Sequence, residues 1–497
     1  SMIRSVARSI RNMPPYPILF TLAWAIGVFT ASGEPLAYFW RPLLVTLAPV
    51  LVSLLAIRLA NVRRQAATLG FTAAWFTFLV AWWIVLPLLG IVAWRLAVDW
   101  WRRRTALSPI REGRLAGVTR IANYFSVVLL AVTMAGMLLT FNVDVPPARQ
   151  LGDVESGAPD VYLLMLDGYP RSDTLAELGI DNAPFLADLE SRGFDVSDHS
   201  RSNYNTTMLS LPALFDGAYV AADDGLLPPM ADREAWELRK RSAELQQGRM
   251  LDAFRAHGYR VATVPNVYGA TALLTADDVL DHPYLNQLEN RFIHLTFLEQ
   301  VIDALSPHWI RDQWAASVEN VFRQAQAFSL RDRGWPALFF AHVISPHPPV
   351  LFDSDGRRPD TSACRQPGCG FGSKLIQLGL SLDQYAPLLA GQIAYLNSRV
   401  LTTIDTILDK HPDAVILVFS DHGARFSNEI TDEYFHSFFA ARTPGHQGLY
   451  SDAMSLTNTL PILLNAYFDA AYPVLPSRAW ESDDNTLTGL RERSVGR

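Results

Sequence analysis

The sequence predicts an α-helical transmembrane domain at residues 1–141, a linker at 142–159 and an α/β sandwich with a mostly parallel central sheet at 160–497. Three observations lead to this fold class. Only 18% of the 497 residues are charged and the mean hydropathy is +0.11, which is apolar for a soluble chain. Most of the apolar excess lies before residue 142. After it, continuous apolar runs alternate with helical patterns, as they do in α/β proteins.

Four apolar stretches predict the membrane segments: 16–33, 42–57, 66–94 and 121–141. The third stretch has no charge over its whole length. It is too long for one upright helix and short for two full ones. We therefore expect two short helices that break near Pro87.

The arginines of this region predict its orientation. They cluster before the first stretch, after the second and before the last, at Arg4, Arg8, Arg11, Arg58, Arg63, Arg64, Arg102, Arg103, Arg104, Arg111, Arg114 and Arg120. Cytoplasmic loops are enriched in such residues, and all three clusters can be cytoplasmic only if the third stretch enters and leaves the membrane. The prediction is five spans in a bacterial inner membrane, with everything after residue 142 periplasmic or extracellular. A four-span count, which leaves six arginines outside, is the alternative.

The net charge and the two cysteines limit the possible function class and the cellular compartment. The net charge of −7 argues against a nucleic-acid-binding protein. The two cysteines, Cys364 and Cys369, flank a Pro-Gly turn in "CRQPGC", which can bring their sulfur atoms together as a disulfide in an oxidising compartment. Two separate thiols, or half of a zinc site, are the alternatives, although no second cysteine pair exists to complete such a site.

Polar residues follow three apolar runs of the predicted sheet. The runs begin at "VYLLMLDGYP" and recur at 336–345 and 413–423, with helical patterns at 247–257, 311–331 and 388–411. Asp167, His347 and the pair Asp421–His422 each come just after such a run. Active sites gather at the carboxyl ends of parallel strands, so we expect these residues to meet at one edge of the sheet.

Two carboxylates and an imidazole suit one divalent metal ion, Zn²⁺ or Mn²⁺. The stretch "NYNTTMLSLPALF" at 203–215 places Thr206 and Thr207 before an apolar helix. A threonine hydroxyl is a weak nucleophile unless a base or a metal activates it, and a helix N-terminus also favours a bound phosphate. The alternative is that both threonines only cap the helix.

Six motifs in order resemble the sulfatase-like branch of the alkaline phosphatase superfamily, over about residues 158–470. They are "VYLLMLDGYPRSDTL", "NYNTTMLSLPALF", "FFAHVISPHPPVLFD", "YLNSRVLTTIDTIL", "VILVFSDHG" and "TNTLPILLNAYFD". By architecture the chain is similar to the membrane-anchored lipoteichoic acid synthases and lipid A phosphoethanolamine transferases, which carry five spans and an external catalytic domain.

The resemblance implies specific roles for the residues that match its motifs. It implies Thr207 as the nucleophile and Asp167, Thr207, Asp421 and His422 as the ligands of one metal ion. It implies that His347 contacts substrate. Sulfatases that convert a residue to formylglycine carry Cys or Ser in a C/S-x-P-x-R motif, whereas this chain has Thr207-Met208-Leu209-Ser210-Leu211, so we do not expect a formylglycine sulfatase.

Three further side chains are weaker candidates. His436 and Lys374 are candidate substrate-binding residues, although a loop lysine is usually solvated. His342 lies inside a predicted strand, so we expect a core histidine or one that supports the metal ligands. The segment 284–314 is either an amphipathic stretch on the membrane face or an ordinary packed helical hairpin.

Together these features predict a membrane-bound, metal-dependent phosphotransferase of the cell envelope. It would move a phospho-alcohol group, of the phosphoethanolamine or phosphoglycerol type, from a phospholipid donor to an envelope glycan or lipid acceptor through a phosphothreonine, with His347 as a candidate proton donor. A phosphodiesterase or phosphatase that uses water as acceptor is the first alternative. A non-catalytic envelope scaffold is the second.

Overall fold

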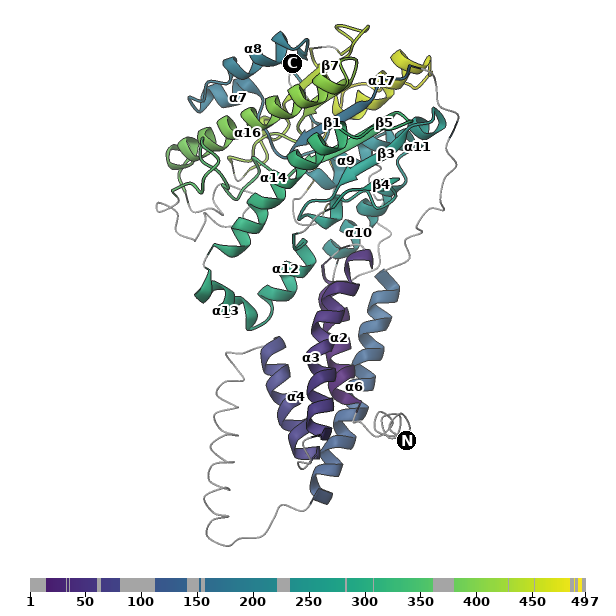
Figure 1. The fold of residues 1–497 in the computed structure, drawn as a ribbon, viewed down its shortest axis with the longest axis vertical. Coiled ribbons are helices and arrows are strands. Elements are labelled where there is room, and N and C mark those ends of the chain that lie inside the picture. The colour runs from purple at the N-terminus through teal and green to yellow at the C-terminus, as the bar shows by residue number, and fades with distance from the viewer. Residues whose placement is uncertain are drawn as a thin grey trace. The chain divides into compact units, whose positions relative to one another are not determined.

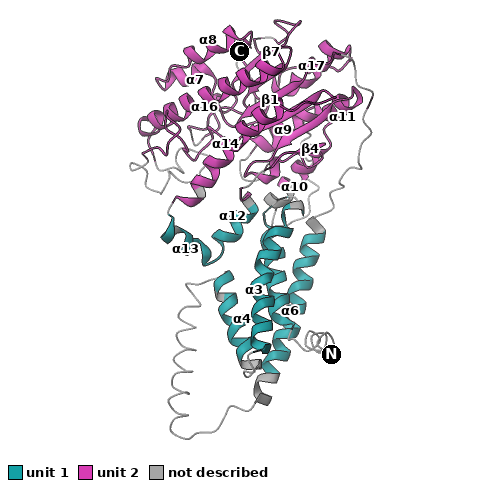
Figure 2. Cartoon of the chain, viewed as in Figure 1, with its two compact units in different colours: residues 1–142, 287–307 teal, residues 143–286, 308–497 magenta. Residues whose placement is uncertain are grey.

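The computed structural model divides the chain into two compact units, residues 1–142 with 287–307 and residues 143–286 with 308–497 (Figure 1, Figure 2). The described residues are 15–32, 34, 36–59, 64–80, 112–140, 152, 157–220, 233–281, 284–306, 308–360, 380–427, 429–450, 452–482, 487 and 490–493. The predicted break near Pro87 and the side chains of Cys364, Cys369 and Lys374 lie outside them, so the helix break, the disulfide and the lysine role stay predictions.

Apolar helices build the first unit, and in the described residues they overlap the four apolar stretches of the sequence. They are α2 (Tyr16–Thr30), the short η1 (Leu36–Tyr38), α3 (Trp40–Leu59), α4 (Arg64–Val80) and α6 (Glu112–Thr140). Among the described residues, α3 and the 117–138 part of α6 are long and apolar enough to cross a membrane. Only a small part of either is buried, unlike the core helix of a soluble protein, and such exposed apolar faces suit a lipid environment. The chain therefore has the features of a membrane-anchored protein.

Contacts within the first unit fix the directions of its helices. Helices α2 and α6 run parallel, because Phe20 near the start of α2 lies 5.8 Å from Phe125 in the middle of α6, while Phe29 at the end of α2 shares a cluster with Met137 near the end of α6. Helix α3 turns back from α2, and the rings of Phe29 and Phe39 stack at 4.5 Å across the turn. The end of α2 and the start of α3 therefore lie at one end of the unit, and Arg58 in the last turn of α3 lies at the other.

Two more helices of this unit come from a distant part of the sequence. They are α12 (Gln287–His294) and α13 (Leu298–Leu305), and the ring of Phe292 packs edge-on against Trp24 of α2 at 5.1 Å. The sequence left open whether 284–314 lies on the membrane or packs as a hairpin. Helix α12 packs on the apolar helices, while Leu298, Val301 and Leu305 of α13 are exposed.

A seven-stranded sheet forms the second unit, in the order β2-β7-β6-β1-β5-β3-β4. Strands β6, β1, β5, β3 and β4 are parallel, and β7 is antiparallel to both of its neighbours. The strands are β1 (Val161–Leu166), β2 (Asp195–Val196), β3 (Arg260–Val264), β4 (Asp278–Val279), β5 (Ala337–Val343), β6 (Val415–Phe419) and β7 (Phe439–Arg442). A separate small ribbon pairs β8 (Ala479–Glu481) with β9 (Arg491–Arg493).

Helices cover both faces of the sheet, which explains why β1 is apolar at every position. Its alternate residues point to opposite faces, so Leu164 joins the core formed with α14 and α16, while Leu163 joins the core formed with α9, α11 and α17. The helices of this unit are α7 (Ser172–Glu177), α8 (Ala183–Ser191), α9 (Thr207–Asp216), α10 (Arg233–Gln246), α11 (Arg249–Ala256), α14 (Trp309–Ser329), α16 (Leu382–Lys410) and α17 (Thr459–Phe468). Short 3-10 turns are η2 (Gly269–Thr271), η4 (Asp432–Tyr434) and η5 (Leu456–Asn458). The predicted α/β sandwich with a mostly parallel sheet is confirmed.

Candidate metal centre

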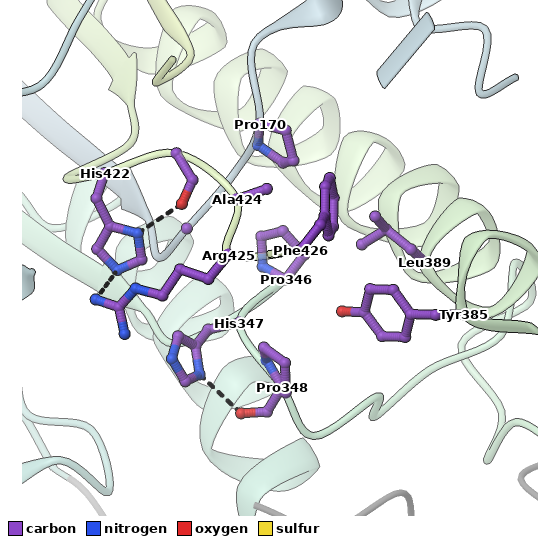
Figure 3. A pocket seen from close by; sticks show the side chains of 12 residues that line it. Pro170, Pro346, His347, Pro348, Tyr385, Leu389, His422, Ala424, Arg425 and Phe426 are labelled. Carbon is purple, nitrogen blue, oxygen red and sulfur yellow. Dashed lines mark hydrogen bonds between the residues drawn. The ribbon is translucent and has the colours of Figure 1, made fainter. Parts of the chain in front are cut away.

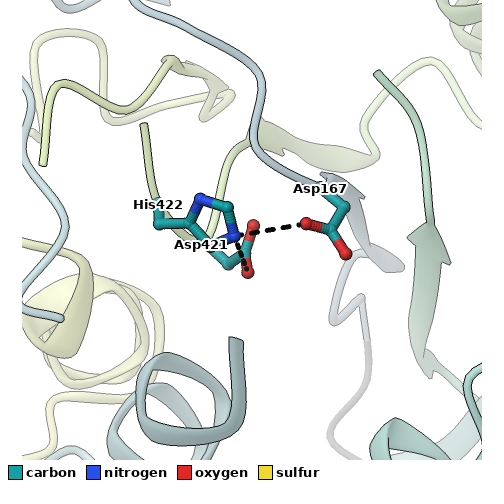
Figure 4. A group of neighbouring side chains, drawn as sticks. All are labelled: Asp167, Asp421 and His422. Atoms are coloured by element: carbon teal, nitrogen blue, oxygen red, sulfur yellow. Dashed lines mark ion pairs between the residues drawn. The ribbon is translucent and has the colours of Figure 1, made fainter. Parts of the chain in front are cut away.

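Three buried side chains meet where the central strands end. Asp167 directly follows β1, and Asp421 and His422 follow the neighbouring parallel strand β6. Parallel neighbours end at the same edge, so residues 254 positions apart become adjacent, and one candidate ligand atom from each of the three lies within 4.8 Å of the others (Figure 4). The sequence-based expectation that these three residues meet is therefore met.

The imidazole of His422 turns its unprotonated nitrogen, Nε2, toward both carboxylates, and Arg425 lies 3.2 Å from the same nitrogen. Its Nδ1 lies 2.7 Å from the Gly423 carbonyl oxygen, which can only accept, so Nδ1 carries the proton. Its Nε2 lies 3.3 Å from Asp167 Oδ1 and 3.6 Å from Asp421 Oδ2. This arrangement of one nitrogen and two carboxylate oxygens is the kind that Zn²⁺ and Mn²⁺ bind.

One oxygen of each carboxylate has a hydrogen-bond partner, and the other has none among the described residues. The Gly168 N–H donates to Asp421 Oδ1 at 3.2 Å, and His342 Nε2 lies 3.1 Å from Asp167 Oδ2. The remaining atoms, Asp167 Oδ1 and Asp421 Oδ2, are buried and accept no hydrogen bond from the described residues. Buried anionic oxygens in that state are costly unless a cation lies between them. The two unpaired oxygens therefore fit a divalent metal ion.

His342 supports Asp167, one of the two roles that the sequence left open for it. It is buried in β5, with Nδ1 3.0 Å from the Thr271 hydroxyl and Nε2 facing Asp167. Burial alone would raise the pKa of Asp167, but the surrounding histidines, with His347 the strongest, hold the pKa of this carboxyl well below its usual range. Asp167 is therefore ionised, as a metal ligand must be.

Thr207 is the first residue of α9 and is buried, with Thr206 as the preceding N-cap in extended backbone. Arg425 connects the loop that leads into this helix with the candidate metal centre. That guanidinium donates to the Asn205 carbonyl at 2.7 Å and lies 3.2 Å from His422 Nε2. The role of Thr207 as fourth ligand and nucleophile stays a prediction.

A pocket opens beside the three candidate ligands (Figure 3). His347, His422 and Arg425 form its polar side. Its other walls are apolar and come from Pro170, Pro346, Pro348, Tyr385, Leu389, Ala424 and Phe426. Arg425 was not predicted from the sequence, where its only signal was its position three residues after His422. A guanidinium next to a metal centre suits an anionic group such as a phosphate.

His347, which follows β5, lines this pocket as a neutral ring. Burial lowers the pKa of His347, and the nearby Arg425 and His422 lower it further. Its Nδ1 lies 2.8 Å from the Pro348 carbonyl oxygen, so the proton sits there and Nε2 has a lone pair. In this state the ring accepts a proton rather than donating one.

His436 is not among the residues that line the pocket. It lies behind Gly423, where a Cβ at the glycine would come within 2.8 Å of the His436 carbonyl oxygen. Burial, with help from the cationic Arg171 and Arg201, lowers the pKa of His436 to about 4 from its ordinary 6.5. Its proposed contact with substrate remains a prediction.

This pKa predicts how stability depends on pH. The unfolded chain binds a proton at His436 below pH 6.5 whereas the folded chain binds it only below about 4, so stability is lost as pH falls through that window. For this half-buried side chain, after discounting for solvent screening, we expect a contribution of about 1 kcal/mol. Melting temperatures from pH 7 to pH 4 should fall less steeply in His436→Gln than in the native chain. Identical pH profiles would contradict the prediction.

Gly168 is needed for two reasons that can be separated by experiment. Its φ is +66°, and a Cβ there would lie 3.1 Å from His422 Cε1. Gly445 has a similar φ of +81° but open space around it. We expect Gly445→Ala to cost about 1 kcal/mol and Gly168→Ala about 2–3 kcal/mol, because only the second also displaces a candidate ligand. Equal losses of melting temperature in the two variants would mean that the contact with His422 has no effect on stability.

Several solved structures are similar to this chain at 13–15% sequence identity. No curated protein matches it. The C-terminal periplasmic domain of EcEptC from Escherichia coli, in complex with zinc, is 15% identical, with 70% of this chain and 96% of that chain covered and a TM-score of 0.42. The lipooligosaccharide phosphoethanolamine transferase A of Neisseria meningitidis, an integral membrane protein, is 13% identical, with 81% and 69% covered and a TM-score of 0.37. The phosphonate monoester hydrolase of Agrobacterium radiobacter is 15% identical, with 62% and 74% covered and a TM-score of 0.38.

The family model described as Sulfatase matches residues 159–455, which is more than half of the chain. That range begins just before β1 and includes Asp167, Asp421 and His422. The six sequence motifs predicted the same assignment. The chain therefore belongs to the sulfatase family.

Proposed function

We propose that this chain is a membrane-anchored, metal-dependent phosphotransferase of the bacterial cell envelope. It moves a phospho-alcohol group of the phosphoethanolamine or phosphoglycerol type from a phospholipid to an envelope glycan or lipid. The observation that carries the proposal is the pair of unpaired buried oxygens on Asp167 and Asp421 facing His422 Nε2, beside a pocket that holds Arg425. Apolar helices in the same chain support a donor that resides in the membrane.

The residues of the candidate metal centre and its pocket have distinct roles in the proposed reaction. Asp167, Asp421 and His422 would hold one Zn²⁺ or Mn²⁺ together with Thr207, and the bound metal would lower the pKa of a hydroxyl and neutralise phosphate charge. Arg425 would bind a phosphate oxygen of the donor. The Thr207 hydroxyl would give its proton to His347 Nε2 as its oxygen attacks phosphorus. The bond from phosphorus to the donor's alcohol would break, and that alcohol would leave with the proton from the His347 ring.

The second half of the reaction regenerates the threonine. An acceptor hydroxyl attacks the phosphothreonine, gives up its proton, and leaves with the phospho-alcohol group. His347 Nε2, which holds a lone pair in the neutral ring, is suited to take that proton. The protonated ring would then return that proton to the Thr207 oxygen as its bond to phosphorus breaks.

The test is mass spectrometry of the peptide that contains Thr207 after the purified chain is incubated with envelope phospholipids and Zn²⁺ or Mn²⁺. We expect an adduct on Thr207, and its mass identifies the transferred group. Addition of a glycan or lipid acceptor should then discharge the adduct faster than water does. Discharge at the same rate by water alone would instead assign a phosphodiesterase, and an unmodified Thr207 under all conditions would argue for the scaffold.

We further propose that the membrane helices cross a bacterial inner membrane several times and that the sheet unit is periplasmic or extracellular. The arginines at the start of α4 and in the last turn of α3 support a cytoplasmic location for that end of the helices. Labelling of single cysteines by a reagent that does not cross membranes, in intact cells, tests this orientation.

A further inference from the structure

The hairpin α12–α13 (residues 287–307) is attached firmly to the helices of the first unit. Its helix α12 buries Phe292 against Trp24 and buries Leu288 in a cluster with residues of α2. An ion pair of 3.0 Å between Glu289 and Arg41 fixes the same helix to the start of α3. The position of the hairpin on the apolar helices is therefore determined by side chains of its first helix.

The turn between its two helices is held as well. The backbone N–H of Phe297 donates to the Phe78 carbonyl at 3.0 Å, and this carbonyl lies in the last turn of α4, where helix carbonyls lack an intrahelical partner. Within the turn, His294 Nδ1 lies 2.6 Å from a Glu299 carboxylate oxygen. Helix α13 thus leaves the turn in a fixed direction.

Helix α13 exposes an apolar face that its attachment does not use. Leu298, Val301 and Leu305 are spaced by three and four residues, so they share one face of the helix, and all three are exposed, Leu305 by 82%. The side chains of Leu295 and Phe297, which precede the helix, are exposed too. An amphipathic helix with such a face is typical of segments that lie in a membrane interface.

The hairpin lies at one particular end of the apolar helices. Phe292 contacts α2, and Glu289 contacts the first turn of α3, far from Arg58 in its last turn. Trp40, at the same end, is 58% exposed, and tryptophan is enriched at membrane–water interfaces. Because arginine clusters mark the cytoplasmic side, the hairpin belongs to the opposite side.

We propose that α13 lies in the outer interface of the lipid bilayer, with Leu298, Val301 and Leu305 among the acyl chains near the headgroups. This inference rests on the membrane localisation proposed above. Attraction to anionic lipid headgroups does not drive this contact, because residues 287–307 contain three acidic residues and only one arginine. The partner is therefore the apolar part of the lipid, and binding needs no anionic headgroup.

The experiment places an environment-sensitive fluorophore on Leu305→Cys in the full-length chain, with Cys364 and Cys369 replaced by serine. The protein is reconstituted in phosphatidylcholine vesicles, with or without lipids that carry a nitroxide near the headgroup end of the acyl chain. We expect the nitroxide lipids to reduce the fluorescence at residue 305 by roughly half. Gln300→Cys, on the opposite side of the same helix, is the matched control and should be quenched much less. Leu51→Cys, in the middle of α3, is paired with lipids that carry the nitroxide at the far end of the acyl chain, and it reports whether the helices are in the bilayer.

The outcomes separate the two proposals. Quenching at 51 without quenching at 305 would overturn the interfacial position of α13 and leave the membrane anchor intact. No quenching at 51 would overturn the membrane localisation itself. An apolar environment at 305 that nitroxide lipids do not quench would mean that protein covers this face, which also overturns the inference.

Discussion

An Asp421→Asn variant is expected to lose its bound metal ion and at least about a thousandfold of its transferase rate. Asp421 Oδ2 is buried without a hydrogen-bond donor, so a cation is its natural partner. The substitution keeps an oxygen for the Gly168 N–H, which now donates to Oδ1 at 3.2 Å, and removes one of two neighbouring buried charges. Without metal, the variant should therefore melt at the same temperature as the native chain or higher.

Metal content and melting temperature together check this prediction. Zn²⁺ or Mn²⁺ at about 100 times its dissociation constant should stabilise the native chain by about 2.7 kcal/mol, and the variant hardly at all. Asp405→Asn is the matched control, because Asp405 lies in α16 and pairs with Arg192 at the surface. If Asp421→Asn bound metal as the native chain does, the three side chains would be only a buried ion-pair network.

Thr207→Ala should abolish the covalent intermediate while the metal centre stays in place. With its nucleophile absent, we expect the transferase rate to fall by about 10³–10⁴ and the adduct on residue 207 to disappear. The helix should survive, because alanine is a good helix former at the first position of α9. Thr207→Ser keeps a hydroxyl and should retain measurable activity.

Thr206→Ala is the control that distinguishes a nucleophilic threonine from one that only caps helix α9. Thr206 is the N-cap of α9, but its side chain makes no capping hydrogen bond, so its loss should change neither the rate nor the stability much. Measurements of the rate, the adduct and the melting temperature on the three variants distinguish these roles. An adduct that persists in Thr207→Ala, or a loss in Thr206→Ala as large as in Thr207→Ala, would remove Thr207 from the mechanism.

The sequence predicts the sheet best where strands are buried on both faces. "VYLLML" is apolar at every position because helices cover both sides of β1, and the same holds for β5 and β6. The antiparallel β7 lies next to β6, and its short "FAAR" segment has no pattern that distinguishes it from a loop. The membership of 287–307 in the first unit depends on packing against Trp24 and Arg41, which are more than 240 residues away.

The same distinction applies to the site. Asp167, Asp421 and His422 were predictable, because parallel strands that are neighbours must end together and the chain shows which residues follow them. Arg425 was not, because its position depends on a loop that turns back toward His422 and the Asn205 carbonyl. The requirement for glycine at 168 follows from the ring of His422, which comes from another strand and is invisible in the local sequence.

The hairpin α12–α13 also bears on how this protein can be produced. A recombinant fragment that starts at residue 143, chosen to leave out the hydrophobic N-terminal third, would still contain residues 287–307. Phe292 would then have lost Trp24, and Glu289 would have lost Arg41. Such a truncation leaves an aggregation-prone apolar segment in the middle of the fragment. A well-behaved fragment therefore requires that the 21 residues from 287 to 307 be replaced by a short hydrophilic linker.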